Sequence, residues 1–216
     1  MIVTLEGAPA VGKSTVAAHL QSAHGCYVVP EANKLFGKDN RETNLRYCQK
    51  QVERWRLAKQ ERSQNFSILD GDIFQPIWFS ALFADEDWGD FDQIVNFFNL
   101  ALRDGSIEFP DLYIFFFVDE NLRAQREFER SEALGRSYES AVKKIAKYRQ
   151  FAGLQKEYFS DLRKKFPELV FFLESKDLFG SAERIVSCRK GHGYQGEDIR
   201  RFIVDWCREK KRVARS

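Results

Sequence analysis

The sequence has few of the residues that build disulfide scaffolds and zinc sites. Four cysteines are scattered without a CxxC pair, and three histidines have no cysteine pair to complete a zinc site: Cys26, Cys48, Cys188, Cys207, His19, His24 and His192. Disulfide frameworks and structural zinc sites need paired cysteines or regularly spaced ligands. We therefore expect free thiols and no zinc site.

Long apolar runs and an excess of one charge are also missing. No stretch approaches the roughly 18 apolar residues of a membrane span, and no basic segment precedes an apolar run at the N-terminus, as it would in a signal peptide. Lys and Arg total 34 against 32 Asp and Glu, a formal net charge of +2, whereas a general nucleic-acid binder is usually more basic. The sequence predicts a cytoplasmic protein without a membrane or nucleic-acid partner.

Short apolar runs alternate with helical patterns along the chain. The expected strands are 2–5, 27–29, 67–69, 112–118 and 169–173. The expected helices are 14–23, 44–63, pieces of 73–104, and 120–165 with a break near Gly135. Because such alternation is typical of parallel sheets covered on both faces, we predict an α/β fold with five parallel strands. With 216 residues, 44% of them hydrophobic, the chain is long enough for one core of full size.

The last part of the chain differs from the rest. Residues 187–196 are rich in glycine and predict a loop, and an amphipathic helix follows from Glu197. The basic residues at the very end predict a tail that frays in solvent. We predict a main domain at 1–178 and a C-terminal extension at 179–216 that packs on it.

The strongest motif is GAPAVGKS at residues 7–14, which fits G-x-x-x-x-G-K-[ST] without a mismatch. Its glycines allow a turn whose N–H groups point at phosphate oxygens, and the following helix adds its positive end. Lys13 would reach the β- and γ-phosphates, and the Ser14 hydroxyl would ligate Mg²⁺. We expect ATP and Mg²⁺ as cofactors. The expected nucleotide contacts are Gly7, Ala8, Ala10, Val11, Gly12, Lys13, Ser14 and Thr15.

Carboxylates follow two of the expected strands. Glu31 comes after the run at 27–29, and Asp70 and Asp72 come after the run at 67–69. Ligands of open α/β sheets lie beyond the carboxyl ends of the strands, and phosphoryl transfer uses acids for Mg²⁺ and for the acceptor hydroxyl. We predict Glu31 as the general base, with Asp70 and Asp72 shared between Mg²⁺ and substrate. The alternative for each is a helix cap or a solvated turn.

Arginines at three- and four-residue steps follow the fourth expected strand. Arg123, Arg126 and Arg130 share one helix face. Phosphoryl transfer spreads negative charge over three oxygens, so this group suits an electrostatic clamp, with Arg123 on the nucleotide and Arg126 and Arg130 in catalysis. The alternative is a solvated helix face paired with neighbouring glutamates.

Aromatic residues follow the Asp70–Asp72 turn at roughly helical spacing. They are Phe74, Trp78, Phe79 and Phe83. An aromatic slot for a flat ring is one interpretation, and packing in the core is the favoured one.

With these residues placed, the chain resembles the nucleoside and nucleotide kinases among P-loop proteins over residues 1 to about 173. The Val29-Pro30-Glu31 segment is similar to that of deoxynucleoside kinases, whose glutamate serves as base. The Asp70-Gly71-Asp72 turn departs from their Glu-Arg-Ser motif and is more similar to nicotinamide riboside kinases and antibiotic phosphotransferases. The resemblance implies a P-loop NTPase three-layer sandwich with an arginine-bearing lid helix, and homodimers are common in the group.

The sequence therefore predicts a kinase that passes the γ-phosphoryl group of ATP to a hydroxyl or phosphate of a small, nucleoside-like acceptor. Two alternatives stay open. One is a P-loop NTPase switch that hydrolyses nucleotide and binds a protein partner, although no Asn-Lys-x-Asp motif occurs late in the chain. The other is a nucleotide-binding scaffold without turnover.

Overall fold

The computed structural model describes residues 1–37, 43–60, 66–83, 89–188 and 193–213. The strands are β1 (Ile2–Glu6), β2 (Tyr27–Val29), β3 (Ser67–Asp70), β4 (Leu112–Phe117) and β5 (Val170–Glu174). The helices are α1 (Lys13–His24), α2 (Ala32–Leu35), α3 (Asn44–Gln60), α4 (Gln75–Leu82), α5 (Phe91–Arg103), α6 (Glu120–Ala133), α7 (Tyr138–Lys165), α8 (Leu178–Val186) and α9 (Gly196–Val213). The last residues of the expected helix 44–63, part of the 187–196 loop and the end of the basic tail lie outside the described residues.

The five strands form one parallel sheet in the order β2-β3-β1-β4-β5. β1 lies at the centre, so the chain that leaves it emerges in the middle of the carboxyl edge. β2 and β3 lie on one side of β1, and β4 and β5 lie on the other. The strand order therefore reverses at β1, and ligands of open α/β sheets bind at such a reversal.

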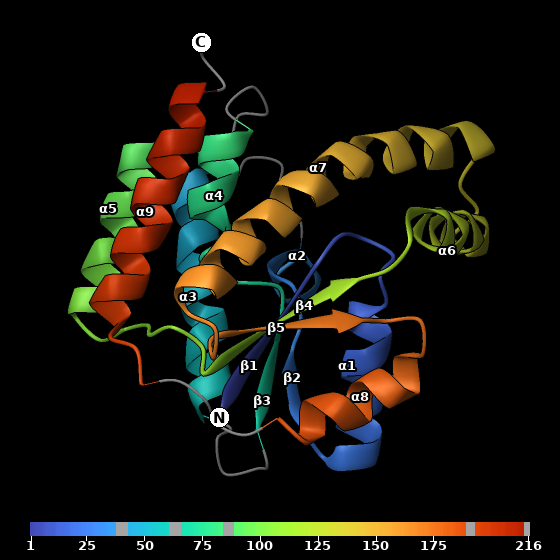
Figure 1. Cartoon of the computed structure of the whole chain (residues 1–216), viewed down its shortest axis with the longest axis horizontal. Coiled ribbons are helices and arrows are strands. Elements are labelled where there is room, and N and C mark those ends of the chain that lie inside the picture. Colours follow the sequence, from blue (N-terminus) through green and yellow to red (C-terminus); the bar gives the residue numbers. More distant parts are fainter. Residues whose placement is uncertain (38–42, 61–65, 84–88, 189–192, 214–216) are drawn as a thin grey trace.

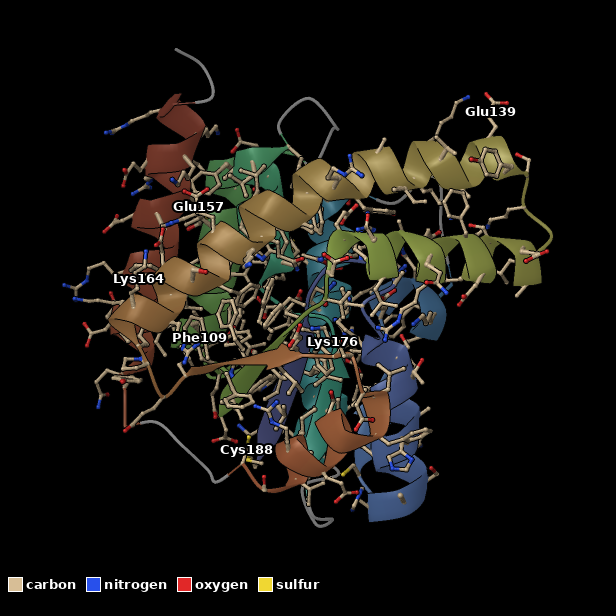
Figure 2. All side chains as sticks on the ribbon, turned by 45° about the vertical axis from the view of Figure 1, so that its right-hand side comes forward. Phe109, Glu139, Glu157, Lys164, Lys176 and Cys188 are labelled. Carbon is tan, nitrogen blue, oxygen red and sulfur yellow. The ribbon has the colours of Figure 1, made fainter. Side chains whose placement is uncertain are left out.

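Helices cover both faces of the sheet, as the apolar runs predicted (Figure 1). Along β4, Tyr113 and Phe115 enter the core beneath α3, α4, α5, α7 and α9. Ile114 and Phe116 enter a second core beneath α1 and α8. Side chains fill the space between the layers (Figure 2). The α/β class and the three-layer sandwich are confirmed.

Helices α6 and α7 form a hairpin at the carboxyl edge. The chain breaks between them at Gly135, whose φ is 64°, near the predicted position. Ser137 begins α7 by accepting a hydrogen bond from the Ser140 N–H. The 28-residue α7 then crosses above the sheet, with α6 beside its first half (Figures 1 and 2). This arrangement brings side chains of both helices toward the loop after β1.

The C-terminal helices belong to the two cores. α9 packs against α4 and α7, and the Trp206 indole N–H donates to Asp161 Oδ2 at 3.0 Å. α8 packs against α1, and its Ala182 and Ile185 are fully buried. A domain boundary at residue 178 stays a prediction. Within the described residues, no helix combines the length and apolar character that crossing a membrane requires.

Candidate functional site

The GAPAVGKS loop joins the carboxyl end of β1 to the first turn of α1. Gly7 has φ 133° and Gly12 has φ 102°, which only glycine adopts at low cost. A Cβ on Gly7 would lie 2.4 Å from the Phe116 carbonyl oxygen, and one on Gly12 would lie 2.3 Å from Leu178 Cδ2. Both glycines are therefore required by conformation and by packing. The first turn of α1 contains no acidic residue, so its positive end is available to an anion.

Lys13 and Ser14 begin α1 and point in different directions. The Lys13 ammonium bends back over the loop and donates to the carbonyl oxygens of Gly7 and Ala8, the latter at 3.2 Å. The Ser14 hydroxyl donates to Asp70 Oδ2 at 2.9 Å. The structure thus brings together Ser14 and Asp70, the two residues that the sequence predicted as metal ligands.

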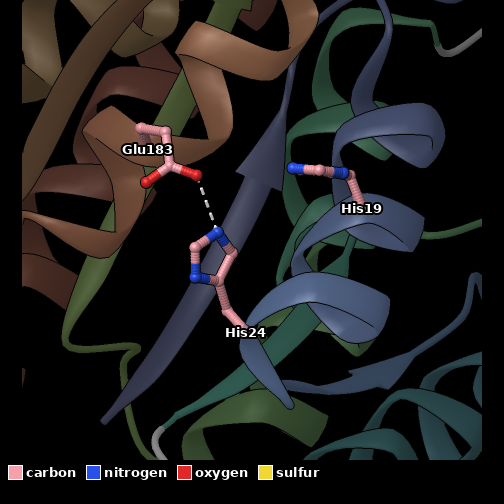
Figure 3. Close-up of side chains that lie close together, drawn as sticks. All are labelled: His19, His24 and Glu183. Atoms are coloured by element: carbon pink, nitrogen blue, oxygen red, sulfur yellow. Dashed lines mark hydrogen bonds and ion pairs between the residues drawn. The ribbon is translucent and has the colours of Figure 1, made fainter.

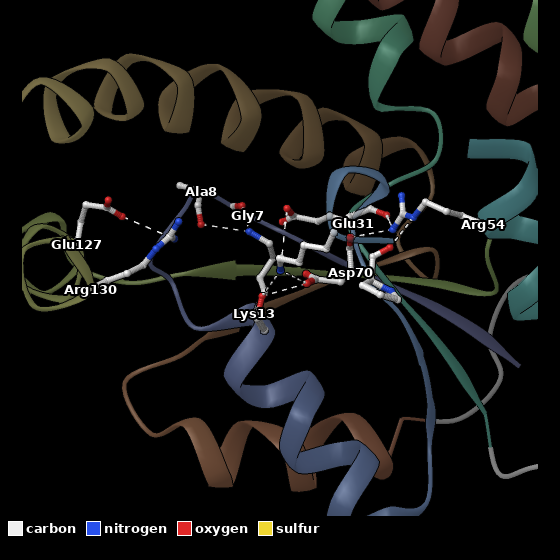
Figure 4. A network of polar contacts seen from close by, with 12 residues as sticks. Gly7, Ala8, Lys13, Glu31, Arg54, Asp70, Glu127 and Arg130 are labelled. Carbon is white, nitrogen blue, oxygen red and sulfur yellow. Dashed lines mark hydrogen bonds and ion pairs between the residues drawn. The ribbon is translucent and has the colours of Figure 1, made fainter. Parts of the chain in front are cut away.

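Asp70 ends β3 and is nearly buried, with 4% of its side chain exposed. Its Oδ2 also accepts from the Lys34 ammonium at 3.1 Å, and its Oδ1 has no hydrogen-bond partner among the described residues. Lys34 lies 4.0 Å from Glu31 Oε2 as well. Figure 4 shows Glu31, Asp70 and Lys13 converging beside the loop. A serine hydroxyl and a carboxylate with a spare oxygen are donors that suit Mg²⁺.

Asp72 is placed differently, although it lies only two residues further along the chain. Its carboxylate is buried, accepts from the Phe74 N–H and from the Tyr113 hydroxyl at 3.2 Å, and does not line the cavity described below. Burial, reinforced by the nearby Glu6 carboxylate, raises the pKa of Asp72 to about 8. The structure therefore does not bring Asp72 to the metal ligands.

Glu6 is the last residue of β1 and lies beneath the loop. Its oxygens accept from the Asp72 N–H at 2.5 Å, from the Gly7 N–H at 3.2 Å and from the Gln155 amide at 2.5 Å. Burial raises the pKa of Glu6, against the opposing effect of Lys13. Glu6 thus links the start of the loop to the turn after β3 and to α7.

Arg54 clamps two strand ends from α3. Its buried guanidinium donates to the Pro30 carbonyl at 2.9 Å, to the Asp70 carbonyl at 2.8 Å and to the Gly71 carbonyl at 3.0 Å. Gln51, one turn earlier, accepts from it at 2.6 Å. Because Pro30 precedes Glu31, this clamp sets the distance between the two strand ends that carry the candidate base and the candidate metal ligand.

A cavity of about 510 Å³ opens between these strand ends and α7. Of the predicted residues, Gly7, Lys13, Glu31 and Asp70 line it. The opposite wall is aromatic and contains Phe79, Phe83, Tyr148 and Phe151. The centroid of the Phe151 ring lies 5.2 Å from that of Phe79 and 5.4 Å from that of Phe83. Core packing holds for Phe74 and Trp78, which are fully buried, whereas Phe79 and Phe83 face the cavity.

The three arginines of α6 have different surroundings. Arg126 donates to the Val11 carbonyl of the loop at 3.3 Å and to the Ser175 carbonyl after β5 at 2.9 Å. Arg130 is half-exposed, with Glu127 3.7 Å away. Arg123 is buried, pairs with Glu120 within α6, and donates to the Ile145 carbonyl of α7 at 3.2 Å. Only Arg126 contacts the loop directly.

The remaining predicted loop residues are arranged around the backbone turn. Ala10 has φ 67°, the one non-glycine residue with a positive φ among those described. Ala8 and Val11 are buried, and Val11 also accepts from the Ser175 hydroxyl at 2.5 Å. Thr15 is exposed on the first turn of α1.

Several residues of the site were not predicted from the sequence, among them Lys34, Arg54, Gln75 and Gln155. The sequence did hold one signal for Arg54. Gln51 and Arg54 lie three residues apart on a predicted helix, next to the apolar residues Val52 and Trp55, so two polar side chains adjoin its apolar face. Gln75 and Gln155 had no comparable signal, because they reach the cavity only through the docking of α4 and α7.

The sequence model of the AAA domain family matches residues 2–149. The chain belongs to the AAA domain family. None of the curated proteins matches the sequence. Among solved structures, deoxyadenosine kinase from M. mycoides with the products dCMP and a flexible dCDP bound is 17% identical, with a TM-score of 0.52 over 86% of this chain and 96% of that one. The same kinase with dATP bound is 19% identical, with a TM-score of 0.52 over 86% and 97%.

At these identities the likeness of this AAA domain to the kinases concerns the fold. The similarity to the P-loop nucleoside kinase-like family that the sequence predicted is confirmed at that level. The assignment of individual residues depends on the geometry of the site.

Proposed function

We propose that this protein is a kinase that transfers the γ-phosphoryl group of ATP, with Mg²⁺, to a hydroxyl or phosphate of a small nucleoside-like molecule. The observation that carries the proposal is one cavity lined by both Lys13 of the phosphate loop and Glu31. A phosphate donor and an acceptor bound there would meet at the carboxyl edge of the sheet, where open α/β folds bind ligands. The kinases of similar fold bind deoxynucleotides, which supports an acceptor of this class.

The loop supplies the donor subsite. Its backbone turn at Gly7 and Gly12 and the uncapped first turn of α1 direct N–H groups toward the phosphates of ATP. Lys13 would leave its two loop carbonyls and pair with the β- and γ-phosphates. Arg126 already donates to the Val11 carbonyl of the loop, so its guanidinium lies beside the donor subsite, where it would stabilise the charge of the transferred group.

Ser14 and Asp70 would hold the magnesium ion. The fit rests on two observations, the 2.9 Å contact between their oxygens and the unpartnered Asp70 Oδ1. The ion would neutralise negative charge on the phosphates of ATP. Asp72 is proposed to support the turn rather than to hold metal, because its carboxylate points into the core.

Glu31 is proposed as the general base. It occupies the N-cap position of α2 without making a side-chain capping bond, so its carboxylate is not committed to the helix, and half of its side chain is exposed. It lines the cavity opposite the aromatic wall, within reach of an acceptor hydroxyl. A positioned base contributes about 10²–10⁴ in rate.

The cavity walls suit a flat, polar-edged acceptor. Phe79, Phe83 and Phe151 provide ring faces for stacking. Gln75 provides an amide that both donates and accepts hydrogen bonds, and Gln155, whose amide nitrogen already donates to Glu6, provides its amide oxygen as an acceptor. A heterocyclic base with alternating donors and acceptors matches such a lining.

Release of ADP tests the proposal directly. Purified protein with Mg-ATP is incubated with nucleosides, nucleoside monophosphates, nicotinamide riboside and aminoglycoside- or phenicol-type alcohols, and ADP formation is followed for each. We expect one class, nucleoside-like, to stimulate release with stoichiometric phosphorylated product. Slow release that no acceptor changes would contradict the kinase and favour an NTPase switch.

A further inference from the structure

Lys34 of α2 contributes a cation to the candidate metal site. Its Nζ lies 3.1 Å from Asp70 Oδ2 and 3.2 Å from Ser14 Oγ. The same ammonium lies 4.0 Å from Glu31 Oε2. One lysine therefore bridges the two proposed metal ligands and the proposed base.

Lys34 and a divalent cation would compete for the same oxygens. Mg²⁺ binds oxygen at about 2.0–2.1 Å in strict octahedral geometry, so an ammonium on Asp70 Oδ2 and Ser14 Oγ blocks two of its coordination directions. The two cations would also repel at this separation. Asp70 is nearly buried, and a buried carboxylate needs one of the two cations close by.

We infer that Lys34 is a positioning residue that holds the Asp70–Ser14 pair until the divalent cation replaces it, and that its displaced ammonium then pairs with Glu31. This inference rests on the proposed function of the site. It links the Lys34–Asp70 contact to Mg²⁺ binding. Mg²⁺ must weaken the Lys34–Asp70 contact by the same factor by which that contact weakens Mg²⁺ binding. It also gives α2, a single turn after β2, a role in coupling metal entry to the base.

The test compares Lys34→Met and Lys34→Arg with the parent and with Lys59→Met, whose ammonium pairs with Glu108 on the surface. Thermal midpoints are recorded across a Mg²⁺ series without nucleotide, and Mg²⁺ binding is measured by calorimetry in the presence of ADP. We expect Lys34→Met to melt lower than the parent without Mg²⁺, to gain more from added Mg²⁺, and to bind Mg²⁺ about tenfold tighter, within the usual range of coupled sites. Lys34→Arg and Lys59→Met should match the parent.

Equal Mg²⁺ shifts in Lys34→Met and the parent would overturn the inference. Should Lys34→Met not fold, Lys34→Gln replaces it under the same criterion. If Lys34→Met changes the response to Mg²⁺ as expected but no acceptor stimulates turnover, the kinase proposal fails and the inferred role of Lys34 stands. If an acceptor stimulates turnover but Lys34→Met responds to Mg²⁺ like the parent, the kinase proposal stands and the inferred role of Lys34 fails.

A different observation concerns the far end of α1, where α8 packs on it. His19 and His24 of α1 and Glu183 of α8 place one donor atom each within 4.8 Å of one another. His24 Nε2 lies 2.9 Å from Glu183 Oε1 (Figure 3). The His19 ring is held edge-on against Phe179, with centroids 4.8 Å apart. The sequence led us to expect no zinc site, and it separates Glu183 from His24 by 159 residues.

We propose that these three side chains form a binding site for a divalent transition metal of the zinc class. Two imidazoles and a carboxylate are a zinc ligand set that leaves a fourth position open. Zinc–nitrogen bonds of about 2.0–2.1 Å would bring the donor atoms roughly 3.3 Å apart, a small adjustment from the observed spacing. The metal would cross-link α1 to α8, whose Leu178 packs on Gly12 of the phosphate loop.

Calorimetry with Zn²⁺ tests this site, in a buffer with excess Mg²⁺ to occupy oxygen sites. We expect one Zn²⁺ per chain in the parent and in Cys188→Ser, which removes a partly exposed thiol. His24→Gln and Glu183→Gln should each weaken Zn²⁺ by more than the roughly 10- to 100-fold cost of losing a supporting partner, while ADP affinity confirms their fold. Unchanged Zn²⁺ affinity in both variants, or loss of binding in Cys188→Ser, would overturn the proposal.

Discussion

The phosphate loop and the cavity proposed for the acceptor are built in opposite ways. The loop takes its shape from one continuous stretch, residues 7–14, and offers mainly backbone N–H groups. The cavity is lined by side chains from α2, α3, α4 and α7 together with strand ends. A backbone site depends on a local motif, whereas a side-chain site depends on how distant elements dock.

This contrast predicts how the two regions respond to mutation. In the loop, few side chains matter, and each serves the same step for every acceptor. In the cavity, many side chains each contribute a little, and their loss should change acceptor preference before it changes ATP binding. The variants below separate these two responses.

The largest effect is expected for Lys13→Ala. Removing the one side-chain charge of the loop should lower kcat by roughly 10³-fold, the upper range for losing a single group that stabilises the transition state. Lys13 donates to two loop carbonyls and opposes the burial that raises the pKa of the Glu6 carboxylate, so the free energy of unfolding should fall by about 1.5–3 kcal/mol, the range for hydrogen bonds to a charged group. Steady-state ADP release and urea unfolding measure the two quantities. A variant with parent turnover would remove the loop from the mechanism.

Glu31→Gln should come next. The amide keeps the shape but cannot accept a proton, so kcat should fall by about 10²–10⁴ while the affinity for ATP, measured by calorimetry, stays close to the parent value. The matched control is Glu53→Gln, an exposed glutamate paired with Arg56 on α3. If Glu31→Gln and Glu53→Gln turn over alike, another group must act as base.

Phe151→Ala is expected to act on the acceptor alone. It removes the ring that contacts both Phe79 and Phe83, and a stacking contact is worth about 0.5–1.5 kcal/mol beyond its area. The acceptor KM should therefore rise about tenfold with little change in the KM for ATP. Phe128→Ala, which removes a ring on the outer hairpin stacked on Tyr138, is the control. Equal rises in both KM values would place Phe151 outside the acceptor wall.

The sequence predicted the regular elements of the fold because their patterns are long or strongly apolar. All five strands lie within one or two residues of the expected ranges, and the break in 120–165 falls at Gly135 as expected. α2 is a single turn and leaves no periodicity to detect. α8 contains Gly180, which lowers intrinsic helix propensity, so packing against α1 stabilises a segment that its composition does not mark as helix.

The site was predictable where a residue's position follows from topology alone. Lys13, Glu31 and Asp70 reach the cavity because parallel strands end at one edge of the sheet. Asp72 shares that edge, but Gly71, with φ 95°, redirects the chain and turns the next side chain into the core. Arg54 depends on which face of α3 meets the sheet, and a motif does not encode this.

Asp72→Asn sharpens the contrast between the two aspartates through the pH dependence of stability. The folded protein holds the pKa of Asp72 at about 8, against an ordinary value of 3.8, so between these values the folded state binds a proton that the unfolded state lacks. The stability from this group is complete at low pH and is lost as pH rises toward 8, with a slope of up to about 1.4 kcal/mol per pH unit. Asparagine binds no proton, so urea midpoints of Asp72→Asn should change less between about pH 5 and pH 8 than those of the parent.

The control is Asp92→Asn. Asp92 is exposed near Arg208, so this variant should keep the parent slope. Because the pKa of Glu6 is also raised, part of the slope remains in Asp72→Asn. An unchanged slope there would mean that Asp72 is ionised in the folded protein, which would return it to the candidate metal ligands beside Asp70.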